Sequence, residues 1–157
     1  MKYDPRLNVV LYAPEIPYNT GSVGRTCVAV GAKLWLVRPL GFRLDDYYLR
    51  RAGLDYWPKL EYEAVEDWAS LVKRLPEKRR WLFSKSARRT YTDVAFQRDD
   101  VLVFGCESSG LPRTLLDAEN DACLRVPIRP DVRSLNLSNT VAIVLYEALR
   151  QGVRMPG

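Results

Sequence analysis

The sequence predicts an α/β fold, with a mainly parallel sheet flanked by helices. Short apolar runs rich in β-branched residues alternate along the chain with segments of helical periodicity. This is the pattern of parallel strands joined by helical connections. The 157 residues, of which 47% are apolar, suffice for one sizeable core. We therefore expect a single domain over residues 1–157.

Each strand is predicted from an apolar run bounded by turn residues. The runs at 7–13 and 101–104 are the clearest, because they are almost wholly apolar. The predicted strands are Leu7–Ala13, Lys33–Val37, Trp81–Ser84, Val101–Phe104 and Ala122–Ile128.

The helices are predicted from periodic apolar segments and from the residues that end them. Gly31, Gly53, Pro76 and Gly152 each follow such a segment, where glycine or proline stops a helix. Pro112 begins another, because proline is accommodated in a first helical turn. The predicted helices span 21–30, 45–51, 67–75, 112–118 and 136–151.

The composition excludes several kinds of chemistry. The chain has no histidine, which rules out Ser-His-Asp and Cys-His catalysis and histidine-bound metals. Its three cysteines are far apart in sequence and lack zinc-site spacing, so we expect no metal. No apolar run approaches the roughly 20 residues of a membrane span, and the N-terminus lacks a signal-peptide pattern. We therefore expect a cytoplasmic protein that does not bind membranes.

The net charge of +5 is unevenly distributed. The segment Lys78–Thr92 contains six basic residues and no acidic one, with aromatic residues interleaved. It is either a solvated surface or a phosphate-binding patch, and the arginines and aromatic residues favour a nucleic-acid partner.

Three polar loops are expected to follow strands, at the edge where parallel sheets bind ligands. The first contains Asn19–Arg25, with two glycines and two hydroxyls at a predicted helix start. It is neither a P-loop nor a dinucleotide-binding motif. Asn19 or Thr20 could simply cap the helix. Arg25 is expected near the first turn, where a cation is unfavourable unless it has an anionic partner.

The second loop contains a carboxylate, and the third contains a run of small polar residues. Glu107, among small residues between Gly105 and Gly110, could orient a hydroxyl or offset a ligand's charge; alternatively, it is solvated in an ordinary connection. The third loop, Arg125–Asn139, has more polar residues than one helix cap requires. The helix after it is apolar nearly all round, which predicts burial on several sides, in part by a second subunit.

These three constellations, in this order, resemble the SPOUT class of RNA methyltransferases. Within its 2′-O-methyltransferase branch, the chain is most similar to the small tRNA (cytidine/uridine wobble nucleotide) 2′-O-methyltransferases. The motifs that carry the resemblance are Leu11–Gly21, Pro39–Phe42, Arg50–Tyr56, Phe104–Glu107, Gly110–Pro112 and Ile128–Asn139.

The resemblance implies a deep C-terminal trefoil knot, a homodimer, S-adenosylmethionine bound in the knot, and the anticodon loop of tRNA as substrate. It implies catalytic roles for Arg25, Ser134, Asn136 and Glu107. The cofactor-binding residues it implies are Phe83, Ser84, Gly105, Glu107, Gly110, Val126, Ile128, Ser134 and Leu135. Cys106 and Ser108–Ser109 depart from the residues expected in the family.

The implied reaction is methylation of the ribose 2′-hydroxyl of the wobble nucleotide, position 34. Because the sulfonium methyl group is already electrophilic, such an enzyme mainly aligns it with the oxygen, which supplies about 7–11 kcal/mol at best. Arginine is normally protonated, so Arg25 is expected to orient phosphate and hydroxyl, with Glu107 or a substrate phosphate as proton acceptor. The alternatives are a 2′-O-methyltransferase for another tRNA or rRNA position and a non-catalytic RNA-binding protein.

Overall fold

The computed structural model describes residues 7–52 and 56–153 of the chain. Seven strands form one sheet in the order β3-β2-β1-β6-β4-β7-β5, and every pairing between them is parallel. The strands are β1 Asn8–Tyr12, β2 Lys33–Val37, β3 Tyr62–Val65, β4 Arg80–Phe83, β5 Arg89–Thr90, β6 Val101–Phe104 and β7 Cys123–Arg125. The predicted mainly parallel sheet is therefore confirmed.

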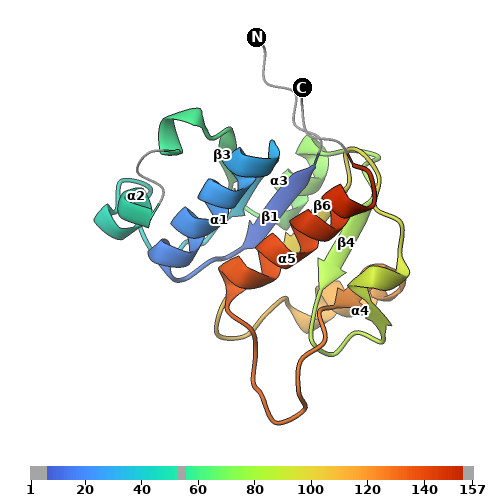
Figure 1. Ribbon diagram of the computed structural model, residues 1–157. Helices are drawn as coiled ribbons and strands as arrows, with labels where there is room; N and C mark the ends of the chain where they lie inside the picture. The colour runs from blue at the N-terminus through green and yellow to red at the C-terminus, as the bar shows by residue number, and fades with distance from the viewer. Residues whose placement is uncertain (1–6, 53–55, 154–157) are drawn as a thin grey trace.

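Helices cover both faces of this sheet (Figure 1). They are α1 Pro17–Val30, α2 Tyr47–Ala52, α3 Trp68–Arg74, α4 Arg113–Ala118 and α5 Leu137–Arg150, with short 3₁₀ turns at Trp57–Lys59, Tyr91–Asp93 and Asn120–Ala122. None of the helices in the described part of the chain is long and apolar enough to cross a membrane.

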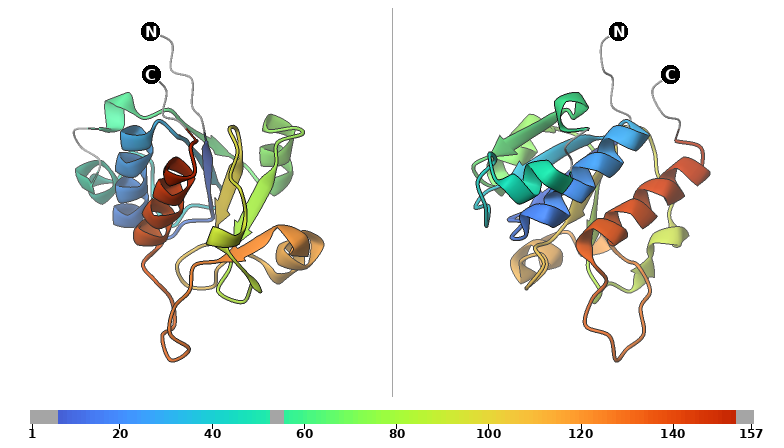
Figure 2. Two further views of the ribbon diagram at one scale, coloured as in Figure 1. Left: turned by 45° about the vertical axis from the view of Figure 1, so that its right-hand side comes forward. Right: turned by 60° about the vertical axis from the view of Figure 1, so that its left-hand side comes forward.

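The core has two halves because successive side chains of a strand point to opposite faces. Val9 and Leu11 of β1 pack on the face covered by α1 and α5, whereas Val10 packs on the face covered by α3. Helices α1 and α5 lie side by side (Figures 1 and 2). Helix α5 thus buries the side chains on one of its sides against the sheet and α1.

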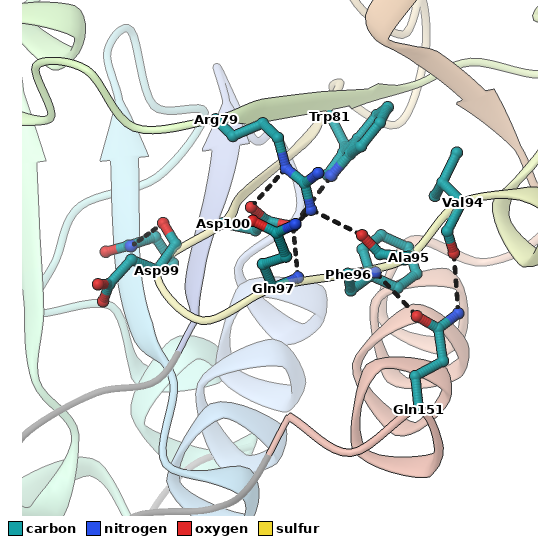
Figure 3. Close-up of polar contacts among 10 residues, drawn as sticks. Arg79, Trp81, Val94, Ala95, Phe96, Gln97, Asp99, Asp100 and Gln151 are labelled. Carbon is teal, nitrogen blue, oxygen red and sulfur yellow. Dashed lines mark hydrogen bonds and ion pairs between the residues drawn. The ribbon is translucent and has the colours of Figure 1, made fainter.

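At the amino edge of the sheet, Asp100 closes a buried polar network (Figure 3). Its carboxylate is 2% exposed and accepts hydrogen bonds from Arg79, from the indole of Trp81 and from the backbone of Gln97. Because these donors satisfy a buried charge, the network fixes the start of β4 against the start of β6.

Two predicted boundaries were wrong, and two strands were not predicted. Helix α1 begins at Pro17, which occupies its first turn, and not near residue 21. The fifth predicted strand ends at Arg125, before Pro127, which has no N–H to donate to the sheet. The edge strands β3 and β5 were not predicted, because they are half-exposed or only two residues long.

Other predicted boundaries agree with the structure. Gly31 ends α1 in the left-handed conformation, with φ of 73°. Asn136 caps α5, and Gly152 follows its end with φ of 105°. Gly53, the predicted stop of the helix at 45–51, lies outside the described residues.

Candidate functional site at the carboxyl edge of the sheet

The carboxylate of Glu107, in the loop after β6, holds the start of α1. It accepts hydrogen bonds from the backbone N–H of Glu15 at 3.0 Å and of Ile16 at 2.6 Å, and from the Asn19 amide at 3.4 Å. Both N–H groups belong to the residues that lead into α1, and an anion is favoured near the N-terminus of a helix. Glu107 therefore braces the entry to α1 from a distant loop and is not a solvated side chain.

A second contact runs in the opposite direction between the same two loops. Glu15 accepts hydrogen bonds from the Ser108 backbone N–H at 3.1 Å and from its hydroxyl at 2.6 Å. The Ser108 and Cys106 side chains lower the pKa of the Glu15 carboxyl. The loops after β1 and β6 are thus joined by two carboxylates, each bound to backbone of the other loop.

Asn19 and Asn136 extend this network to the third loop. The Asn136 amide donates to the Asn19 side-chain oxygen at 3.2 Å. The Asn136 oxygen accepts from the backbone N–H groups of Ser138 and Asn139, so it caps α5. A chain of side-chain hydrogen bonds therefore links Glu107, the start of α1 and the start of α5.

The turn after β6 depends on glycine at two positions. A Cβ atom on Gly105 would lie 2.2 Å from the carbonyl carbon of Gly110, so only glycine fits there. Gly110 has φ of 68°, and its N–H donates to the carbonyl of Cys106 at 3.0 Å. The tight turn presents the backbone of Glu107–Ser109 toward the neighbouring loops.

The loop after β7 projects from the body of the protein (Figure 2). Every residue from Arg129 to Asn136 is exposed. The loop is attached on both sides: Arg133 donates to the carbonyl of Ser108 at 3.1 Å, and Lys85 donates to the carbonyl of Arg133 at 3.0 Å. The segment thus contacts the loops after both β4 and β6.

The predicted cofactor residues lie on these loops or at the strand ends before them. Phe83 is buried and stacks on Phe104 with ring centroids 4.6 Å apart, so its side chain belongs to the core and only its backbone faces the edge. Ser84 shares a hydrogen bond with Ser86. Val126 and Ile128 are half-buried, whereas Ser134 and Leu135 are exposed.

Arg25 is not part of this network. It lies six residues beyond Asn19 on α1, or about 9 Å along the axis, and its side chain is exposed. Its guanidinium lies 4.8 Å from the ring centroid of Tyr56. No carboxylate of the described residues is within 4.0 Å of it. The prediction that Arg25 lies near the first turn was wrong, because α1 begins earlier.

Sequence reasoning missed Glu15 and gave Asn19 only a capping role. Both signals are visible in the sequence. Glu15 follows a buried strand and precedes Pro17 at a helix start, and Asn19 stands in the first turn of that helix. No group of three or more potential metal ligands lies within the ranges that the structure describes.

The fold and site define the class of protein. It is an α/β protein with a parallel sheet whose ligand edge is built from three cross-linked loops, without histidine. The SpoU rRNA Methylase family model matches residues 6–146, and the chain belongs to this family.

Relatives in this family are similar over nearly the whole chain. The tRNA (cytidine(34)-2′-O)-methyltransferase of Burkholderia cenocepacia (strain HI2424) is 50% identical over 147 residues, covering 92% of this chain and 94% of that protein. A solved structure described as giving structural insights into the 2-OH methylation of C/U34 on tRNA has a TM-score of 0.89 and 43% identity, covering 94% and 97% of the two chains. An AdoMet-bound rRNA methyltransferase from Sinorhizobium meliloti shares the fold with a TM-score of 0.83 at 23% identity, over 97% of this chain and 62% of that one.

Proposed function

We propose that the protein transfers a methyl group from S-adenosylmethionine to the ribose 2′-oxygen of the wobble nucleotide, cytidine or uridine 34, of tRNA. The similarity to relatives of that name, at up to 50% identity over nearly the full length of both chains, is the observation that carries the proposal. The 157 residues would act as one catalytic domain, in the cytoplasm.

The carboxyl edge of the sheet fits the cofactor. An adenosine needs an apolar surface and backbone groups for its ring, and Val126, Ile128 and Leu135 offer apolar side chains on a loop of exposed backbone. The tight Gly105–Gly110 turn brings further backbone to the same place. We assign the backbone of Phe83 and Ser84, and the side chain of Ser134, to the same site.

When bound, the cofactor supplies an electrophilic methyl group on sulfur. Methyl transfer would form a bond from the ribose oxygen to that carbon and break the carbon–sulfur bond, so the hydroxyl proton would need an acceptor. The Glu107 oxygens already receive hydrogen bonds from Glu15, Ile16 and Asn19. This geometry favours Glu107 as a brace for the site and a substrate phosphate as the proton acceptor. Asn136 would hold the start of α5 in place beside the reacting end.

Arg25 would orient the phosphate and ribose of the target nucleotide. Its exposed guanidinium has no carboxylate partner in the described part of the chain, so it is available to an RNA phosphate. We expect Arg25→Ala to lose methyl transfer while binding S-adenosylmethionine normally by calorimetry. Arg43→Ala is the matched control, because Arg43 is exposed but paired with Asp45 at 3.1 Å. Near-normal turnover by Arg25→Ala would refute this role.

A C-terminal trefoil knot is part of the proposal. The loop at 129–136 contacts Lys85 on one side and Ser108 on the other before α5 returns to pack beside α1. A knotted chain end would place the loop after β7 against the loops after β4 and β6, and these two contacts support that arrangement.

A homodimer is also part of the proposal, formed through the outer face of α5. Ile143 and Tyr146 are 37% and 55% exposed on a helix whose inner side is fully packed. Burying them against a second copy would explain why this helix is apolar nearly all round. Light scattering should show a dimer that Tyr146→Glu dissociates. Tyr47→Glu, which alters an equally exposed tyrosine on α2, should leave the dimer intact.

The test of the activity is methylation of unmodified total tRNA with methyl-labelled cofactor, followed by nuclease mapping. Label at position 34 as a 2′-O-methylated pyrimidine is the expected result. Label confined to another position, or to rRNA, would overturn the assignment of the substrate.

A further inference from the structure

We propose that four cations, Lys85, Arg88, Arg125 and Arg133, bind backbone phosphates of the RNA that carries the target nucleotide. We call this set the cationic edge. The proposal rests on the proposed function, because it names the side chains with which that same site holds its RNA. It also divides the basic segment Lys78–Thr92, which is continuous in sequence, into two parts with different roles.

The first part of the segment is neutralised within the protein. Arg79 donates hydrogen bonds of 2.9 and 2.7 Å to the buried carboxylate of Asp100 (Figure 3). Arg80 bonds to Glu119 in the same manner, with its Nε 3.0 Å from the carboxylate. The ion pairs are Lys78–Asp99, Arg79–Asp100 and Arg80–Glu119. These cations stand at the start of β4, opposite the ligand edge, and contribute little free charge.

The cationic edge has no such compensation. No carboxylate of the described residues lies within 4.0 Å of any of its four cations. Lys85 and Arg133 donate only to neutral carbonyl groups, and Arg88 and Arg125 are exposed. Arg89 is left out of the set because its guanidinium also lies over the ring of Trp81, 5.7 Å from the ring centroid, in addition to its bond to the carbonyl of Asp121.

The fold brings the two segments that carry the four cations together, because β5, after Arg88, pairs with β7, which ends at Arg125. The backbone of Ser84, after β4, donates to the carbonyl of Leu124 in β7 at 2.9 Å, so the two following loops are neighbours. Lys85 then reaches across to the backbone of Arg133, and Arg133 reaches Ser108 in the turn after β6. The cationic edge is therefore continuous with the loops that form the candidate site.

A cluster of like charges without carboxylates repels itself and is retained at a cost to stability, which an anionic partner removes. A nucleic-acid backbone supplies regularly spaced anions, and each phosphate contact releases a counterion. The guanidinium groups of Arg88, Arg125 and Arg133 suit phosphate oxygens because they can donate two parallel hydrogen bonds.

The test is the salt dependence of tRNA binding by the Arg88→Gln/Arg125→Gln double variant. Each phosphate contact contributes roughly −0.7 to −0.9 to the slope of log K against log salt. Losing two contacts should reduce the slope by roughly 1.4–1.8 and weaken binding roughly 20-fold to 60-fold at about 0.1 M salt. The Lys78→Gln/Arg113→Gln variant is the control, because it removes the same net charge from residues paired with Asp99 and Asp117.

The control should keep the wild-type slope, and both variants should bind S-adenosylmethionine like the wild type. An unchanged wild-type slope in the Arg88/Arg125 variant would overturn the proposal that the cationic edge binds RNA, even if the wild type methylates tRNA. The same unchanged slope is expected if this surface binds an acidic protein instead. A reduced slope in a protein that methylates no tRNA would instead support the edge and refute the proposed function.

Discussion

Gly105→Ala is the substitution that the structure predicts most sharply. The added Cβ would lie 2.2 Å from the carbonyl carbon of Gly110 and 2.3 Å from the nitrogen of Leu111. Ordinary contact begins at 3.4 Å, so the two backbone segments must separate by about 1.2 Å. Both neighbours are backbone atoms, and Leu111 is buried, so no flexible side chain can yield instead.

Overpacking of this kind costs about 1–3 kcal/mol of folding free energy. For a chain of this length each kcal/mol lowers Tm by about 2–4 °C, so we expect a decrease of roughly 2–12 °C. The displaced turn would also move the backbone beside Glu107 by about an ångström, and a displacement of that size near reacting groups can reduce turnover on the order of 100-fold.

Differential scanning calorimetry would measure the decrease in Tm, and a methyl-transfer assay would measure the loss of turnover. Gly110→Ala is the matched control in the same turn: its Cβ meets nothing within 4 Å, and only its φ of 68° is unfavourable. That strain costs about 1–2 kcal/mol. Turnover and Tm that are unchanged by Gly105→Ala would refute the reasoning.

Three further predictions follow from single residues. Asn136→Ala removes the cap of α5 and the bond to Asn19, and should cost about 0.5–2 kcal/mol in urea unfolding. Asn136→Ser should recover the cap but not the bond, so equal stability of the two variants would count against the cap. The Thr20 hydroxyl is buried without a hydrogen-bond partner among the described residues, so Thr20→Val should stabilise the protein by about 1 kcal/mol, and a loss of stability would reveal a hidden partner. Hydrogen bonds from Arg150 and Gln151 lower the pKa of Glu147 to about 2. Because the pKa is lower in the folded state, the ionised Glu147 carboxylate stabilises the fold at neutral pH, and this stabilisation is lost as pH falls through the acid range toward 2. Glu147→Gln should therefore flatten the decline in stability between pH 5 and pH 2. An unchanged decline would contradict the lowered pKa of Glu147.

The family and the α/β parallel sheet were predictable because both depend on local sequence. Apolar runs such as Val101–Phe104 must be buried on both faces, and only strands flanked by helices do so. Because parallel strands end at one edge, the polar residues after each strand could be assigned to a common site. The edge strands β3 and β5 could not be predicted, because their apolar pattern is too weak or too short.

The partners of charged residues were not predictable, because they come from distant parts of the chain. Glu107 lies 91 residues from Ile16, whose N–H it accepts, and no local pattern indicates that pairing. The basic segment Lys78–Thr92 looks uniform in sequence. It is divided only by carboxylates such as Asp100 and Glu119, which the sheet brings to the start of β4.

The sequence by itself determined the helices, every strand except β3 and β5, the family, and the three loops that meet at one edge. It did so because the burial of apolar runs and the preferences of turn residues act over a few neighbouring positions. Only the tertiary structure decided what the charges in those loops do. Glu107 braces the entry to α1, Arg25 lies away from the network, and the basic segment is divided into paired and unpaired cations. A charge is governed by whatever opposite charge or hydrogen-bond donor lies within a few ångströms, and in this fold those neighbours are set by the packing of the parallel strands.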